Sequence, residues 1–180
     1  MAAKADGNGF RLSGGKTFVA DGTVASRLLV LARTSGRPGD ALGLTLFDID
    51  AARAGLTNEP VQSIDARDFA RLSFENVSAT GDDVVGDVDN GLAAITPGIR
   101  AGQAALAAEL SGLSAGISAM TIGYLKERKQ FDRTIGSFQA LQHRAAHLFA
   151  EIEVTASAIA AAGRALDSDA EHAQTLVSLA

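Results

Sequence analysis

The sequence contains no cysteine in its 180 residues. This absence excludes disulfide frameworks, thiolate metal sites and cysteine nucleophiles, and it is compatible with the cytoplasm, which is the expected location. Residues 1–9 contain no apolar core, so they do not form a secretory signal. No unbroken apolar run reaches the roughly 18–20 residues that cross a bilayer, so we expect a soluble protein without a membrane span.

A broad basic surface is also missing. The formal net charge is −5, and lysine and arginine are scattered except for the cluster at 126–129. Proteins that bind nucleic acid need a continuous basic patch, so this function is not expected. The apolar fraction of 47% is enough for a folded core, which excludes a disordered chain.

The first half of the chain carries the strand and turn patterns. Turn-forming residues at 6–9 and the pair Gly14-Gly15 bound the segments 10–13 and 16–20, which predicts a β-hairpin. Further strands are predicted at 27–32, 41–49 and 69–77. Several short strands separated by turns indicate an antiparallel sheet, a sandwich or a partial barrel over residues 1–85. The acidic segment 82–90 is predicted to be a linker with little packing potential.

The second half, residues 86–180, changes to helical periodicity. Apolar residues recur at intervals of three, four or seven, which predicts two long antiparallel helices joined by a tight turn. The first stripe comprises Ile99, Leu106, Leu110, Leu113, Ile117, Met120 and Tyr124, and the second Phe138, Leu141, Ala145, Leu148, Ile152, Thr155 and Ile159. Ser137 is the expected N-cap of the second helix, which should continue to about Leu166.

A third helix is expected from about Ala170 after an acidic break. An up-down bundle of two helices and a fraction leaves an apolar face uncovered, which indicates a chain that is cut or that needs a partner. The fold class is therefore α+β: a partial antiparallel β-barrel or sandwich domain followed by an incomplete α-helical bundle.

Three blocks, at 6–33, 70–77 and 124–139, resemble the acyl-CoA dehydrogenase family over essentially the whole chain. The third is the most specific, with Tyr124, Glu127, Arg128, Phe131, Ile135, Gly136, Phe138 and Gln139 at the family's spacing. The resemblance implies a flavoprotein oxidoreductase of fatty acid and lipid metabolism that oxidises the Cα–Cβ bond of an acyl-CoA. It also implies FAD as cofactor, electron-transfer flavoprotein as acceptor and a homo- or hetero-oligomer.

The same resemblance implies which residues contact FAD. Arg128, Phe131 and Gln139 would reach FAD bound by a neighbouring subunit, with Phe138 beside them. Phe18 and Ala20 fall where the family commonly has Trp and Thr next to the flavin ring. Phe18 can still shield one face of the ring, whereas Ala20 offers no hydroxyl donor. Asp132 stands where glycine is usual, so the turn geometry could differ from that of the family.

The catalytic base that the family requires is not recognisable. Counting back 22 residues from Tyr124 gives Gly102, followed by Gln103, and neither side chain accepts a proton. The family's other position for the base, a late loop, would lie beyond Ala180. Glu109 is a weak substitute on the same helix. No catalytic residue is therefore assigned, and the isolated chain is not expected to turn over.

Several residues of the sequence also allow other roles. His143, His147 and Glu151 lie at i, i+4 and i+8 of one helix and could begin a metal site, although a polar outer face is the simpler interpretation, and no metal is assigned. Arg128 could be a solvated charge, and Phe131 and Phe18 could be core residues. The missing groups at positions 102 and 20 also allow a non-catalytic partner subunit of a hetero-oligomeric enzyme.

Overall fold

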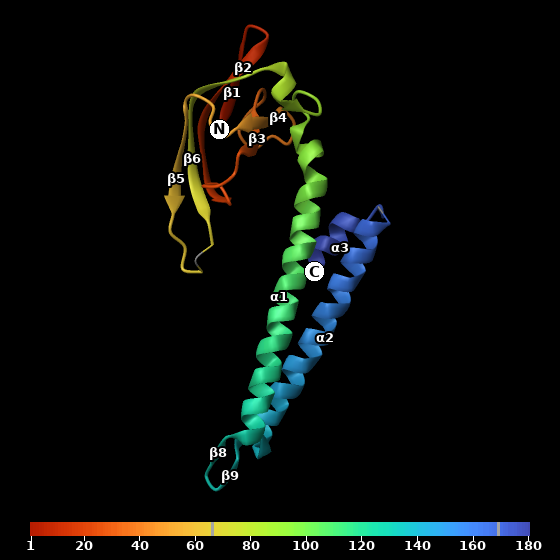
Figure 1. The fold of residues 1–180 in the computed structure, drawn as a ribbon. Helices are drawn as coiled ribbons and strands as arrows, with labels where there is room; N and C mark the ends of the chain where they lie inside the picture. Colours follow the sequence, from red (N-terminus) through yellow and green to blue (C-terminus); the bar gives the residue numbers. More distant parts are fainter. Residues whose placement is uncertain (66, 169) are drawn as a thin grey trace. The chain divides into compact units, whose positions relative to one another are not determined.

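The computed structural model describes residues 1–65, 67–168 and 170–180. The chain divides into two compact units, Met1–Pro97 and Gly98–Ala180. The first is built mainly of strands and the second of helices (Figure 1). The α+β architecture expected from the sequence is confirmed.

The described residues of the first unit form an open mixed sheet. The strands follow the order β5-β6-β2-β1-β3-β4-β7, with β5 and β7 as the free edges. Every neighbouring pair is antiparallel except β1 and β3, which meet in parallel where Ala2 pairs with Arg33. The bounds are Ala2–Asp6, Gly9–Ala20, Arg27–Arg33, Leu44–Asp50, Leu56–Val61, Phe69–Ala79 and Val84–Val85 for β1 to β7.

The predicted hairpin of 10–13 with 16–20 is wrong, because both segments belong to the single strand β2, and the hairpin of this region pairs β1 with β2 instead. β1 pairs with β2 from Ala2 to Asp6, so the chain reverses at residues 7 and 8. β2 then continues through Gly14-Gly15, where its register with β6 shifts. A bulge bends a strand without ending it, which explains why two glycines did not produce a turn.

The core of the first unit consists of alternate strand residues. In β3, Leu28, Val30 and Ala32 are buried, while Leu29 between them is exposed. The fully buried Phe47 of β4 meets Phe10 edge to face at 5.3 Å between ring centroids. The buried cluster comprises Ala3, Leu12, Leu28, Val30, Ala32, Phe47, Ile49, Ala70, Leu72, Phe74, Val77 and Ala79.

The acidic segment is not the poorly packed linker that the sequence predicted. Asp83, in the 3₁₀ turn Gly81–Asp83, is buried and forms an ion pair with Arg53 at 2.6 Å. It also accepts a hydrogen bond from the backbone N–H of Thr80 at 2.7 Å. The hydrogen bonds from Arg53 lower the pKa of Asp83 to about 2. β7 follows at once and pairs with β4, so this segment belongs to the sheet.

The predicted long helices are confirmed as α1, Gly91–Glu127, and α2, Gln139–Asp167, while α3 spans Ala173–Leu179. Gly91 is buried where β4 passes, and a Cβ there would lie 2.3 Å from the backbone nitrogen of Leu46. Ser137 is not the N-cap of α2: its hydroxyl donates to the carbonyl of Thr134 at 2.7 Å within a 3₁₀ turn. Phe138 occupies the N-cap position instead.

The helical unit buries little of its apolar surface. The first predicted stripe, from Ile99 to Tyr124 on α1, is 46–77% exposed, whereas the buried residues of this unit are small: Ala162, Ala165, Ala173 and Val177. By length and hydropathy alone, α1 and α2 could each cross a bilayer, which differs from the expectation based on unbroken apolar runs. Helices in the core of a bundle have the same properties, so the finding does not by itself indicate a membrane span.

Candidate functional site

A two-residue hairpin joins α1 to α2. β8, Lys129–Gln130, pairs with β9, Arg133–Thr134, so Phe131 and Asp132 form the turn. The base of the hairpin is closed by the backbone N–H of Ile135, which donates to the carbonyl of Arg128 at 2.8 Å. Gly136 is required here, because a Cβ would lie 2.7 Å from the carbonyl oxygen of Leu125. Close contact between the end of α1 and the 3₁₀ turn therefore fixes this corner.

Both turn residues have left-handed backbone angles, with φ of 53° at Phe131 and 61° at Asp132. Tight hairpins need positive φ at both central positions, which Asn and Gly supply at low cost. Asp tolerates this conformation, so the substitution for the family's glycine is accommodated. A bulky residue such as Phe does not, and strain of this kind costs on the order of 1–3 kcal/mol. Phe131 is also 84% exposed, so the interpretation of this residue as core is wrong.

Two aromatic rings and a guanidinium contact one another at this corner. Phe131 meets Phe138 edge to face at 6.1 Å between centroids, and the guanidinium carbon of Arg133 lies 4.1 Å from the Phe138 ring centroid. Contacts of this geometry favour one orientation of the rings. The corner therefore presents the Phe131 ring to solvent while Phe138 and Arg133 support it.

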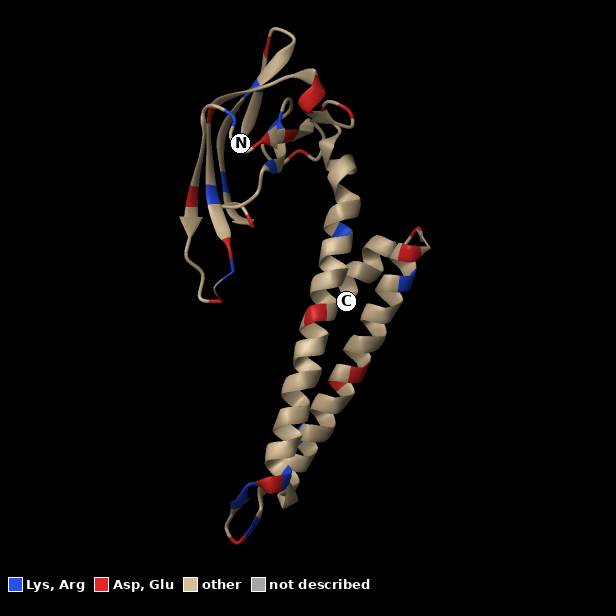
Figure 2. Cartoon of the chain, in the orientation of Figure 1, with Lys and Arg blue, Asp and Glu red and all other residues tan. Residues whose placement is uncertain are grey.

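The polar groups of the same corner are available to a ligand. The sequence places Lys126, Arg128, Lys129 and Arg133 in and beside the hairpin. Figure 2 shows blue basic segments at this corner, with red acidic ones beside them. Within the described part of the chain, the Arg128 guanidinium forms no ion pair or side-chain hydrogen bond, and neither does the amide of Gln139. Gln139 is the first residue of α2. A guanidinium and an amide that lack partners can bind an anion and a polar edge, respectively.

Phe18 and Ala20 lie on β2 in the first unit. Phe18 repeats the features of Phe131: its φ is 52° and it is 71% exposed, so it is not the strand core residue considered as an alternative. Its ring meets Phe69 edge to face at 6.2 Å. Ala20 is exposed and contributes only a methyl group.

A cavity of about 500 Å³ contains both of these residues in its lining. Lys16 lines it too, beside apolar residues of β3 such as Leu28 and Val30. No sequence pattern marks Lys16 as a site residue, because its significance depends on the cavity that it lines together with residues of β3.

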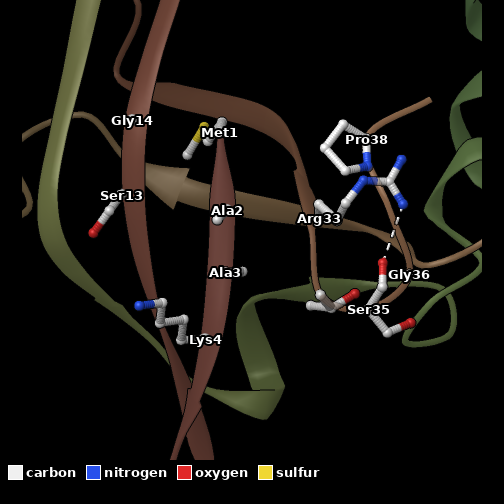
Figure 3. Close-up of a pocket in the computed structure, with 11 residues that line it drawn as sticks. Met1, Ala2, Ala3, Lys4, Ser13, Gly14, Arg33, Ser35, Gly36 and Pro38 are labelled. Carbon is white, nitrogen blue, oxygen red and sulfur yellow. Dashed lines mark hydrogen bonds between the residues drawn. The ribbon is translucent and has the colours of Figure 1, made fainter. Parts of the chain in front are cut away.

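A second cavity, of about 570 Å³, lies beside the start of β1 (Figure 3). Arg33 lines this cavity. Its guanidinium donates to the backbone carbonyls of Ser35, Leu42 and Asp40 at 3.1, 3.0 and 2.7 Å. Arg33 therefore holds the loop between β3 and β4. None of the predicted site residues lines this cavity, and we assign no ligand to it.

The positions considered for a base lie on α1. Gly102 has no atom within 4 Å of a Cβ built on it, and Gln103 is next to it. Glu109 is seven residues further on, which places it on nearly the same helix face but about 10 Å along the axis. The described residues thus place no carboxylate at the position expected for the base.

The suggested metal site does not form. His147 Nε2 lies 3.9 Å from Glu151 Oε1. Across residues 1–65, 67–168 and 170–180, no group of three or more His, Cys, Asp or Glu side chains is placed to hold a metal ion.

Comparison with known proteins identifies the family of the chain. The family model described as "Acyl-CoA dehydrogenase, C-terminal domain" matches residues 89–180, half of the chain. The chain is 30% identical over 194 residues to the mitochondrial short/branched chain specific acyl-CoA dehydrogenase of Bos taurus, covering 99% of this chain and 45% of the relative. It is also 30% identical to the mitochondrial isovaleryl-CoA dehydrogenase of Solanum tuberosum, covering 93% and 42%.

A solved FAD-dependent dehydrogenase has the same fold, with a TM-score of 0.89 and 23% identity over 99% of this chain and 48% of that one. The chain belongs to the acyl-CoA dehydrogenase family. Members of this family are FAD-dependent oxidoreductases, bind acyl-CoA and are oligomeric. The chain spans less than half the length of the curated relatives it matches.

The residues present fit FAD. The cofactor combines a pyrophosphate with a flat aromatic ring and polar edges, and the corner offers a guanidinium, an exposed aromatic face and an amide. The structural observation behind this fit is Phe131, whose ring is exposed on a residue with a positive φ.

Proposed function

We propose that this chain binds FAD for the α,β-dehydrogenation of an acyl-CoA thioester, and that its described residues do not supply the carboxylate base. The observation that carries the proposal is the pair Phe18 and Phe131. Each has a left-handed backbone and a mostly exposed ring, two properties that reduce the stability of the folded chain. Binding of a flat aromatic ligand explains why both rings are exposed to solvent in this chain.

Each residue of the corner then has a defined role. The Arg128 guanidinium forks two hydrogen bonds onto the pyrophosphate of FAD held by a neighbouring subunit. Phe131, supported by Phe138, packs on the cofactor, and Gln139 donates to and accepts from its polar edge. Phe18 shields one face of the ring.

FAD, when bound, accepts the hydride that leaves Cβ while a carboxylate removes the α-proton. The chain's own residues orient the cofactor and exclude water from its faces. Gly102 and Gln103 cannot accept the α-proton, so we propose that the base is supplied from outside the described residues. Electrons would pass on to electron-transfer flavoprotein.

Titration of the purified chain with FAD tests this proposal. Because hydrogen bonds to a charged group contribute about 1.5–3 kcal/mol, R128M should weaken FAD binding by roughly 10- to 100-fold, and R128K should recover part of the loss. R144M is the matched control, since Arg144 is an exposed arginine of α2 outside the corner. Equal FAD affinity in the wild type and R128M would contradict the assignment.

A second role has its own support. Both Ala20 and Gly102 lack groups that a complete active site would use, which favours a non-catalytic partner subunit of a hetero-oligomeric acyl-CoA dehydrogenase. In that role, the chain alone stays free of FAD and gains FAD absorbance only when mixed with its catalytic partner. In the first role, it binds FAD by itself. Turnover of an acyl-CoA by the isolated chain with FAD and a dye acceptor would contradict both.

We further propose a cytoplasmic protein in which α1 and α2 are bundle helices. Both lie inside the segment that matches the C-terminal domain of the family, which supports a bundle rather than a pair of membrane spans.

A further inference from the structure

Lys16 is a half-buried charge that the proposed roles above do not use. Its side chain lines the 500 Å³ cavity together with Phe18 and Ala20. Burial against the apolar lining lowers the pKa of its ammonium, because the charged form loses water. A partly buried ammonium is normally paired with an opposite charge or a hydrogen-bond acceptor.

No such partner lies within the described part of the chain: the Lys16 ammonium makes no ion pair or hydrogen bond there. The other cation in the lining, Arg27, is already neutralised, because its Nε donates to both carboxylate oxygens of Asp48 at 2.9 and 3.0 Å. Lys16 is therefore the uncompensated cation of this cavity, whose lining also includes the neutral hydroxyl of Thr17.

We propose that Lys16 binds the flavin ring directly, donating a hydrogen bond from its ammonium to the carbonyl edge of a ring that lies against Phe18. This inference rests on the proposed function, since it requires FAD in the cavity. The ring is largely apolar on its faces and polar along one edge. A largely apolar cavity with a single uncompensated cation matches this distribution of polarity.

The assignment also accounts for Ala20. An alanine offers no side-chain donor to the cofactor, so the cavity needs another one. Lys16, four residues earlier on β2, supplies that donor from the same lining. It differs from a hydroxyl in carrying a charge, so it stabilises the anionic reduced ring more than the neutral oxidised ring.

Three variants test the role of Lys16. K16M removes the charge and keeps most of the side chain's length, K16R keeps the charge, and K4M removes an exposed lysine of β1 as the matched control. We would measure the dissociation constant of oxidised FAD, and the equilibrium between oxidised and reduced bound FAD against a reference dye. Urea unfolding without FAD would show whether each variant folds.

We expect K16M to weaken oxidised FAD binding several-fold, and to weaken binding of the reduced form by roughly tenfold more. K16R should restore most of the difference between the two forms, and K4M should match the wild type. Because K16M removes an unpaired, desolvated charge, it should fold at least as well as the wild type. K16Q provides a second neutral variant if K16M fails to fold.

Two results would overturn the inference. The first is a K16M protein that binds both forms of FAD as the wild type does. The second is an equal loss for both forms that K16R does not rescue, since this indicates a structural role. Failure of the proposed function looks different: the wild type and all variants, K4M included, would then show no FAD binding.

Discussion

The two units use their apolar residues in opposite ways. In the first, large side chains such as Phe47, Leu12 and Ile49 are fully buried between strands. In the second, the large side chains of the α1 stripe from Ile99 to Tyr124 are about half exposed or more, and the buried residues are mostly alanines. The difference shows that residues 1–97 contain their own core, whereas residues 98–180 present an apolar face with no cover from within the described unit.

The largest expected effect on stability distinguishes the buried apolar residues of the first unit from the exposed apolar residues of α1. F47A should destabilise the chain by about 3–5 kcal/mol, because it empties a closed site. L113A, on the exposed stripe of α1, should cost less than about 1 kcal/mol. Urea unfolding of both variants measures this contrast. A loss for L113A as large as that for F47A would show that the stripe is covered in solution.

A smaller effect concerns the ion pair that ties the acidic segment to the sheet. The pKa of Asp83 is lowered to about 2 in the folded state, so its stabilisation is fully present above the unfolded value of about 3.9 and is lost as the pH falls towards 2. The difference between the two pKa values corresponds to about 2–3 kcal/mol.

D83N should therefore lower the free energy of unfolding by roughly that amount at pH 7 and by much less near pH 2. D82N is the control, since Asp82 is the exposed neighbour on the same 3₁₀ turn. Unfolding curves at both pH values would contradict the account if the effect of D83N did not depend on pH.

The smallest effect on stability is expected at Phe131. Asn favours the left-handed turn that Phe131 occupies, so F131N should relieve strain while losing the ring contact with Phe138. We expect a net change within about 1 kcal/mol by thermal unfolding, together with weaker FAD binding. A large loss of stability would mean that Phe131 serves the fold of the helical unit and not a ligand.

The sequence predicted the helices and strands that show a regular hydrophobic pattern within their own residues. The alternation in 27–32 and the three-four spacing from Ile99 to Tyr124 both gave the correct element. β5 was missed, because an edge strand such as Leu56–Val61, with Pro60 inside it, has little alternation and is held by its register with β6. β7 was missed because two valines in an acidic segment give no periodic signal.

The candidate site was only partly predictable. The family resemblance located Arg128, Phe131, Phe138 and Gln139, and the structure brings them to one corner. The positive φ of Phe18 and Phe131 could not be seen in the sequence, because it arises from the turn and from the irregular pairing of β2 with β6. The contact of Arg133 with Phe138 and the cavity around Lys16 likewise depend on tertiary packing.

Phe18 and Phe131 are central to the proposed FAD site, because both rings are kept exposed for the cofactor. Equilibrium titration with FAD of the wild type, F18A, F131A and the double variant tests it directly, with F149A, an exposed phenylalanine of α2, as control. We predict that each site variant weakens binding at least several-fold, that the double variant is weakest and that F149A matches the wild type. FAD binding by the double variant with the affinity of the wild type would contradict the account.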